Sequence, residues 1–267
     1  MSRLHFQFGC GSHKLAGVLD TAPGETGLLW VSGGNELRSG AFAGQAQLAA
    51  RLAAKGFPVF RFDRRGIGDS EGDNRGFTRS ARDIRAALDA FRGMVPQMNR
   101  VIAFGNCDAA SALMLSGGEG FDGLILSNPW TIEDSDDGTS DNGDTAPVHT
   151  AGAIRARYFE KLKNPSEIGR LLRGGVDLRK LARGMMGAMR SDAQPSGLAQ
   201  DMRDGLNGFD GHVAILIAEA DRTAQLFEAA WERDDARIAR CAGAGHAYVE
   251  PASQIWLEEH ILAALRA

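Results

Sequence analysis

The sequence predicts an α/β fold with a mostly parallel central sheet and helices on both faces. Short continuous apolar runs recur along the chain, and such runs are typical of strands buried on both faces. Most are followed by a segment with apolar residues at helical spacing. Because strands that alternate with helices form parallel sheets, the pattern favours this class over an all-helical or all-β fold.

The opening of the chain reads as a β-hairpin, with strands over 4–8 and 15–19 joined by a polar, glycine-containing turn. The next elements are a buried strand over 27–32, a helix over 41–55, a strand over 57–62 and a helix over 78–91. Pro58 stands near the start of its strand, where a ladder donor is dispensable. The first half of the chain thus supplies the hairpin and two strand–helix units.

The second half continues with strands over 101–105, 123–127, 213–218 and 236–240 and helices over 223–230 and 254–266. Residues 133–144 are acidic and rich in Gly, Ser and Thr, so little order is expected there. Helices are predicted over 151–163 and 178–189. We therefore expect a core domain formed by 1–128 and 212–267 and a lid insertion over 129–211, above the carboxyl ends of the strands. The alternative is a surface elaboration.

Composition and charge exclude several classes of protein. The 267 residues are 43% hydrophobic and 24% charged, which suits one large domain with an insertion. The net charge of −4 gives no electrostatic basis for binding nucleic acid or an anionic membrane. No apolar run reaches the roughly 18–20 residues of a membrane span, and no signal-peptide pattern opens the chain. We expect a cytoplasmic protein, monomeric or homodimeric.

The chain has three cysteines, Cys10, Cys107 and Cys241. Their odd number and the lack of short paired spacing indicate reduced thiols, neither a disulfide framework nor a zinc site. We expect no metal and no cofactor. Cys10 and Cys241 are interpreted as structural.

Cys107 stands at the turn between a predicted strand and a predicted helix. The strand ends at Gly105-Asn106, and a run of small, helix-forming residues follows Cys107. A thiol at a helix N-terminus meets free N–H groups and a favourable dipole, and such a setting promotes the reactive thiolate. The pattern therefore predicts a nucleophile. The alternative is an inert buried cysteine.

A thiol nucleophile needs a base to take its proton and a carboxylate to orient that base. Asp221 follows the strand over 213–218, and His246 follows the strand over 236–240. Both lie at the same predicted sheet edge as Cys107. Alternatively, Asp221 only caps the next helix, with Glu219 as the orienting group, and His246 is a loop residue without a role.

An acyl-transfer site also needs donors for the developing oxyanion. The backbone N–H of Asp108 directly follows the nucleophile, and a second donor is expected from Gly34 or Asn35, where glycines let the backbone approach a substrate. The alternative for the Gly33-Gly34 segment is a plain tight turn. Trp130, Met185 and Met186 predict an apolar, adaptable substrate pocket, or they merely pack the insertion.

At these residues the chain resembles an α/β-hydrolase. Residues 105–109 resemble the G-x-S-x-G nucleophile elbow, with Cys107 for Ser and Ala109 for the second Gly. Residues 63–72 resemble the D-x-R-G-x-G-x-S-x-G loop of that superfamily. More narrowly, Gly33-Gly34-Asn35, this loop, 106–111 and 221–227 together resemble the exosortase A system-associated hydrolase 1 group, which is linked to exopolysaccharide export. The resemblance implies Cys107 as nucleophile, Asp221 as acid and His246 as base.

The chemistry expected of such a site is hydrolysis of a carboxylic ester, thioester or lactone through an acyl-cysteine. The substrate is therefore a small molecule. Dienelactone hydrolases also use a cysteine in this fold. Two alternatives stay open: an acyltransferase that acts in exopolysaccharide or lipid modification, and a non-catalytic binding protein, because fold alone does not license an activity.

Overall fold

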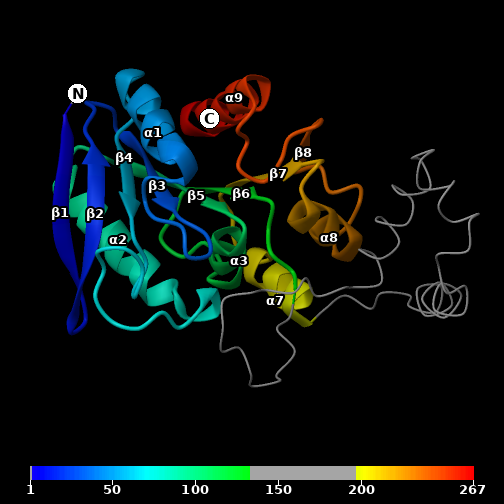
Figure 1. The fold of residues 1–267 in the computed structure, drawn as a ribbon, viewed down its shortest axis with the longest axis horizontal. Helices are drawn as coiled ribbons and strands as arrows, with labels where there is room; N and C mark the ends of the chain where they lie inside the picture. Colours follow the sequence, from blue (N-terminus) through cyan, green and yellow to red (C-terminus); the bar gives the residue numbers. More distant parts are fainter. Residues whose placement is uncertain (1, 133–196) are drawn as a thin grey trace, which may run out of the picture.

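The computed structural model describes residues 2–132 and 197–267. These residues form an eight-stranded sheet with strand order β1-β2-β4-β3-β5-β6-β7-β8 (Figure 1). The strands are β1 (Arg3–Cys10), β2 (His13–Asp20), β3 (Thr26–Val31), β4 (Val59–Phe62), β5 (Arg100–Asn106), β6 (Gly123–Ser127), β7 (His212–Ala218) and β8 (Ile238–Cys241). The pairs β1–β2 and β2–β4 are antiparallel, and all others are parallel. The predicted hairpin and mostly parallel sheet are confirmed.

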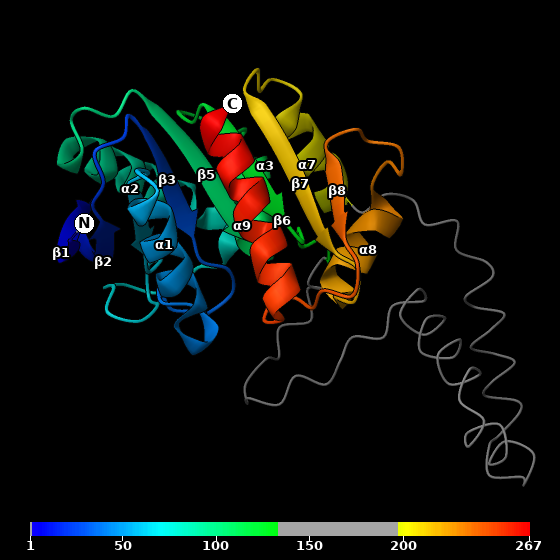
Figure 2. The same ribbon diagram turned by 90° about the horizontal axis from the view of Figure 1, so that it is seen from above.

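Helices cover both faces of the sheet. They are η1 (Ala41–Ala43), α1 (Gly44–Ala54), η2 (Phe77–Arg79), α2 (Ala81–Met94), α3 (Asp108–Leu115), α7 (Gly197–Leu206), α8 (Arg222–Ala230) and α9 (Pro251–Arg266). Helices α1 and α9 lie on one face, and α2, α3, α7 and α8 lie on the other (Figures 1 and 2). This is the layered α/β arrangement that the alternation predicts.

Each face of the sheet has its own hydrophobic cluster. Side chains of β3 alternate between the two, because successive residues of a strand point to opposite faces. Leu28 and Trp30 join the cluster beneath α1 and α9, while Leu29 and Val31 join the cluster beneath α2, α3 and α8. Burying a large apolar side chain stabilises a fold by about 1.5–3 kcal/mol. Burial on both faces explains why these strands are continuously apolar.

The helix predicted over 41–55 begins later than expected. Residues 41–43 form a 3-10 turn, and Phe42 has φ 52°, in the left-handed region that bulky residues rarely adopt. Its side chain is 90% exposed. The α-helix itself starts at Gly44, so Phe42 is not on the buried face that its spacing suggested.

The end of the predicted insertion packs with the core. Helix α7 lies against α3, and Ala199, Met202 and Leu206 are buried there. We therefore propose that any insertion ends before Gly197 rather than at residue 211. The helices predicted over 151–163 and 178–189, together with Met185 and Met186, lie outside the described residues. In the described part of the chain, no helix has the length and apolar character needed to cross a membrane.

Candidate active site

Cys107 occupies a sharp turn between β5 and α3. Its backbone has φ 62° and ψ −130°, a conformation that non-glycine residues adopt rarely and mostly at functional sites. The Cys107 N–H donates to the carbonyl of Ser127 at 3.0 Å, which fixes the turn against the end of β6. The side chain is partly exposed. The structure therefore presents the thiol at the carboxyl edge of the sheet, where a nucleophile is expected.

Close packing at this turn explains the residues on either side of the thiol. A Cβ placed on Gly105 would lie only 2.7 Å from the backbone carbonyl carbon of Ala109, so the start of α3 passes directly over Gly105. Ala109 itself is fully buried. The first glycine of the elbow thus provides the close approach, and the turn accommodates alanine in place of the second.

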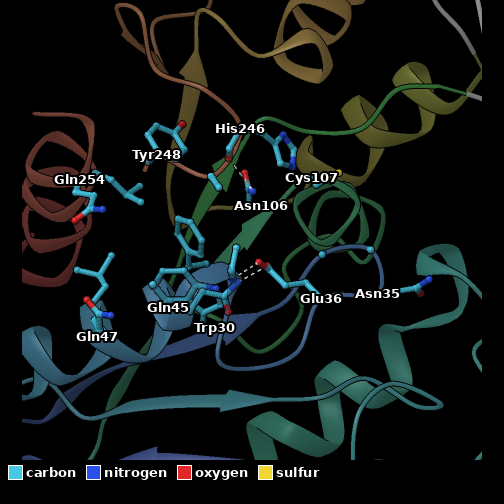
Figure 3. Close-up of a pocket in the computed structure, with 18 of the residues that line it drawn as sticks. Trp30, Asn35, Glu36, Gln45, Gln47, Asn106, Cys107, His246, Tyr248 and Gln254 are labelled. Carbon is cyan, nitrogen blue, oxygen red and sulfur yellow. Dashed lines mark hydrogen bonds between the residues drawn. The ribbon is translucent and has the colours of Figure 1, made fainter. Parts of the chain in front are cut away.

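Asp221 and His246 meet next to Cys107, as their positions after β7 and β8 predict. Nδ1 of His246 lies 2.8 Å from Oδ2 of Asp221, and the imidazole ring faces Cys107 (Figure 3). The pKa of His246 is raised to about 10, first by the hydrogen bond to Asp221 and then by the Cys107 side chain. His246 is therefore protonated at neutral pH, and an imidazolium is the partner that stabilises a thiolate.

Asp221 also caps the helix that follows it. Its Oδ2 accepts a hydrogen bond from the backbone N–H of Ala224 at 3.1 Å, which satisfies one of the free donors at the start of α8. Asp221 therefore caps α8 and contacts the His246 ring at the same time. The assignment of Asp221 rather than Glu219 as the orienting group stays a prediction.

Two asparagines hold the loop that contains His246. The carbonyl of His246 accepts from Nδ2 of Asn106 at 3.3 Å and from Nδ2 of Asn128 at 3.4 Å. Asn128 also donates to Oδ1 of Asn106 at 3.0 Å and accepts from the N–H of Ala218 at 2.8 Å. Sequence reasoning missed both residues. Their signal was their place at the ends of neighbouring strands, directly before Cys107 and Pro129.

The loop expected to supply an oxyanion donor lies against the elbow. A Cβ on Gly33 would lie 2.4 Å from the carbonyl oxygen of Asn106, so only glycine allows this approach. However, the Gly34 N–H donates to Oδ1 of Asp108 at 2.6 Å. The predicted donor at Gly34 is thus engaged by a carboxylate. Within residues 2–132 and 197–267, no acceptor is found for the backbone N–H of Asp108 or of Asn35.

Arg64 ties the same loop to α3. Its Nη2 donates to both carboxylate oxygens of Asp108, at 3.2 and 3.1 Å, and to the carbonyl of Gly34 at 2.5 Å. Arg64 is only 6% exposed, so water screens this ion pair little. The pair fixes residues 33–35 beside the nucleophile.

A cavity of about 310 Å³ opens beside the thiol, on the α1 and α9 side of the sheet. Figure 3 shows the side chains that surround it. Its polar end contains Cys107, His246 and the loop at Asn35, and its apolar walls are Trp30, Leu48, Phe104, Tyr248 and Leu257. Elements of the core therefore build a pocket that the sequence analysis assigned to the insertion.

Trp130 does not line this cavity. Its backbone N–H and carbonyl bind the Ser111 hydroxyl at 2.8 and 2.7 Å, and its Nε1 donates to the carbonyl of Ile132 at 2.8 Å. Trp30, which the sequence analysis did not select, does line the cavity. Its indole Nε1 is buried without a hydrogen-bond partner among the described residues, so it is an unsatisfied donor behind the pocket wall.

The other two cysteines, Cys10 and Cys241, are buried. Burial raises the pKa of the Cys10 thiol and that of the Cys241 thiol, which disfavours their reactive form. Among the described residues, the three cysteines are unpaired. This agrees with structural roles for Cys10 and Cys241.

The sequence profile of the Alpha/beta hydrolase family matches residues 27–255. The chain belongs to this family. A search of curated proteins found no match. Similar solved structures include an α/β-hydrolase, GrgF, from Penicillium sp. sh18 (TM-score 0.64, 17% identity, covering 100% of this chain and 98% of that one). The Pyrococcus furiosus esterase Pf2001 (0.59, 15%, 99% and 90%) and Est1E from Butyrivibrio proteoclasticus, which was solved with ferulic acid (0.58, 14%, 98% and 100%), are similar as well.

At this level of identity, the solved structures show that this hydrolase shares their fold. The family match confirms the α/β-hydrolase membership and fold that the elbow and the loop over 63–72 suggested. The residues that carry out chemistry are argued from the geometry above.

Proposed function

We propose that this alpha/beta hydrolase cleaves a carboxylic ester, thioester or lactone through a Cys107–His246–Asp221 triad. The observation that carries the proposal is the arrangement at one sheet edge. Cys107 stands in a strained turn, and the His246 ring faces it while bonded to Asp221 at 2.8 Å. A nucleophile, a base and an orienting carboxylate in this relation are the parts that acyl transfer needs.

The reaction runs in two steps. The Cys107 thiolate adds to the substrate carbonyl carbon, and the resulting oxyanion accepts from the Asp108 N–H. The C–O or C–S bond to the leaving group then breaks, and the leaving group takes the proton from His246. Water attacks the acyl-cysteine thioester while His246 takes a proton from it. Release of the acid restores the thiolate and the imidazolium.

Two other functions keep specific support. A thioester intermediate also reacts with alcohols, so an acyltransferase in exopolysaccharide or lipid modification fits the same triad and the resemblance to the exosortase-associated group. A non-catalytic binding protein fits the engaged Gly34 N–H, which leaves one fewer oxyanion donor free. A cytoplasmic location and a monomeric or homodimeric state stay predictions.

The decisive experiment compares Cys107→Ala with Cys241→Ala. We expect Cys107→Ala to abolish p-nitrophenol release from short acyl esters and the acyl adduct detected by intact mass after incubation with esters and thioesters. Cys241→Ala is the matched control and should retain both. Full turnover in Cys107→Ala would contradict the triad. Faster transfer than hydrolysis on adding alcohols would favour the acyltransferase, and an unmodified, inactive wild type would favour the binding protein.

A further inference from the structure

A second, smaller cavity of about 100 Å³ lies at the start of α2, and five of its nine lining residues are arginines. Its charged lining residues are Arg64, Arg65, Arg75, Arg79, Arg82 and Asp83. Five arginines against one aspartate give this lining a formal charge of +4, although the whole chain has a net charge of −4. The positive charge is therefore concentrated at one place on an acidic protein.

Only part of this charge is neutralised within the described structure. Arg65 pairs with Asp83 at 2.9 Å, and Arg64 pairs with Asp108 at 3.1 Å. Arg75, Arg79 and Arg82 are exposed, and their side chains have no acidic partner in the described part of the chain. The Arg82 guanidinium lies next to Gly11, so Arg75 and Arg79 are the two arginines that remain available to an anion here.

The backbone around the cavity is organised rather than loose. Oδ1 of Asn74 accepts from the N–H of Gly76 at 3.0 Å, which closes the turn that presents Arg75. A Cβ on Gly66 would lie 2.3 Å from the Asn74 nitrogen, so this turn packs directly on Gly66. The Asp83 carboxylate accepts hydrogen bonds from both the backbone N–H and the side chain of Arg65. The N-terminus of the 14-residue helix α2 adds a favourable dipole for an anion.

This arginine pocket shares a wall with the cavity at Cys107. Nδ2 of Asn74 donates to Oδ1 of Asn35 at 2.9 Å, and these two residues line the arginine pocket and the Cys107 cavity, respectively. Arg64 makes a second link, because it lines the arginine pocket and binds Asp108, the residue next to Cys107. The two cavities are therefore neighbours, separated by the contact between Asn35 and Asn74.

We propose that the arginine pocket binds a phosphate group carried by the substrate whose acyl group reacts at Cys107. A phosphate monoester carries a charge of about −1.5 to −2 and three acceptor oxygens, so a pocket lined by several arginines binds it better than a carboxylate with two oxygens. Paired N–H donors of arginine match phosphate geometry. The arginine pocket can bind phosphate whether or not the proposed function is right. The claim that the phosphate belongs to the substrate rests on the proposed function.

Calorimetry tests the pocket itself, with adenosine 3′,5′-bisphosphate as the probe. We expect the double variant Arg75→Gln, Arg79→Gln to bind it at least tenfold more weakly than the wild type, and high salt to weaken wild-type binding. Arg85→Gln, which removes the same charge further along α2, should bind as the wild type does. Absence of binding to the wild type, or equal affinity for citrate, would overturn the proposal.

Kinetics tests the link to Cys107. The wild type should cleave acetyl-coenzyme A with a higher kcat/KM than the neutral S-acetyl-N-acetylcysteamine, and the ratio of the two should fall about tenfold in the double variant, with no change for the neutral substrate. An unchanged ratio would overturn the link. If the wild type cleaves neither these thioesters nor short p-nitrophenyl esters, the proposed function fails, and calorimetry still decides whether the pocket binds phosphate. If it cleaves the esters alone, the link is overturned and the proposed function stands.

Discussion

A single carboxylate oxygen of Asp221 accepts from both Nδ1 of His246, at 2.8 Å, and the backbone N–H of Ala224, at 3.1 Å. The orientation of the base is therefore coupled to the first turn of α8. The same contact is the main cause of the raised pKa of His246.

We expect Asp221→Asn to lower the pKa of His246 from about 10 toward its ordinary value of 6.5. Asparagine is a good N-cap, so α8 should persist while the charge that stabilises the imidazolium is lost. NMR titration of the His246 ring measures the shift. Turnover should fall by at least about 10²-fold, as expected when a base loses its orienting charge. A pKa that stays near 10 would show that Asp221 is not the cause.

The raised pKa of His246 also predicts a pH dependence of stability. Its folded-state pKa lies above the unfolded value, so its contribution is complete below about pH 6.5 and is lost as pH rises through about 10. The difference in free energy of unfolding between the wild type and His246→Gln should therefore shrink between pH 7 and pH 10. Urea titrations at several pH values measure it, and a difference that grows with pH would contradict the assignment.

Alkylation should distinguish the three thiols. We expect iodoacetamide to modify Cys107 first, because its side chain is partly exposed beside an imidazolium, while Cys10 and Cys241 are buried and have raised pKa values. Peptide mass mapping at neutral pH locates the adduct. His246→Ala should slow modification of Cys107 and leave the other two rates unchanged. Preferential labelling of Cys10 would contradict the prediction.

Asp108→Ala should destabilise the fold more than removal of an exposed carboxylate. The change leaves Arg64, which is 6% exposed, without its carboxylate, and breaking one partner of a buried pair costs about 3–5 kcal/mol. Asp69 also binds an arginine, but its side chain is 71% exposed. Asp69→Ala is thus the control, with an expected loss under about 1 kcal/mol. Equal losses for both variants in urea unfolding would exclude a special role for the Asp108–Arg64 pair.

Trp30→Phe tests the unsatisfied donor behind the cavity wall. The ring centroids of Trp30 and Phe104 lie 4.3 Å apart; phenylalanine keeps an aromatic ring there but removes the unpartnered Nε1. A buried donor without a partner costs about 1–3 kcal/mol, so we expect its removal to offset the lost packing and the free energy of unfolding to change by less than about 1 kcal/mol. Trp30→Ala, which removes the whole ring, is the control and should lose about 3–5 kcal/mol. Equal losses for both variants in urea unfolding would contradict the prediction.

Much of the fold could be predicted from the sequence because its signals are local. Apolar runs that alternate with helical segments predict the strands. Cys107, Asp221 and His246 each follow a different strand, which predicts that they lie at one edge of the sheet. Contacts between distant segments carried no such signal. The engagement of Gly34 by Asp108 and the anchoring of His246 by Asn128 depend on side chains far apart in sequence. The sequence analysis selected Trp130 and not Trp30 for the pocket. Which tryptophan lines the cavity depends on how the helices pack on the sheet, and the local sequence does not show this.

The two asparagines that donate to the His246 carbonyl bear on which residue can stand at position 107. Asn106 is the residue before Cys107, and Asn128 directly follows β6. The backbone of His246 is therefore held at the edge of the sheet by residues other than Cys107. We therefore expect Cys107→Ser to leave the backbone around His246 in place, so that the two variants differ in the chemistry of one atom and not in the scaffold.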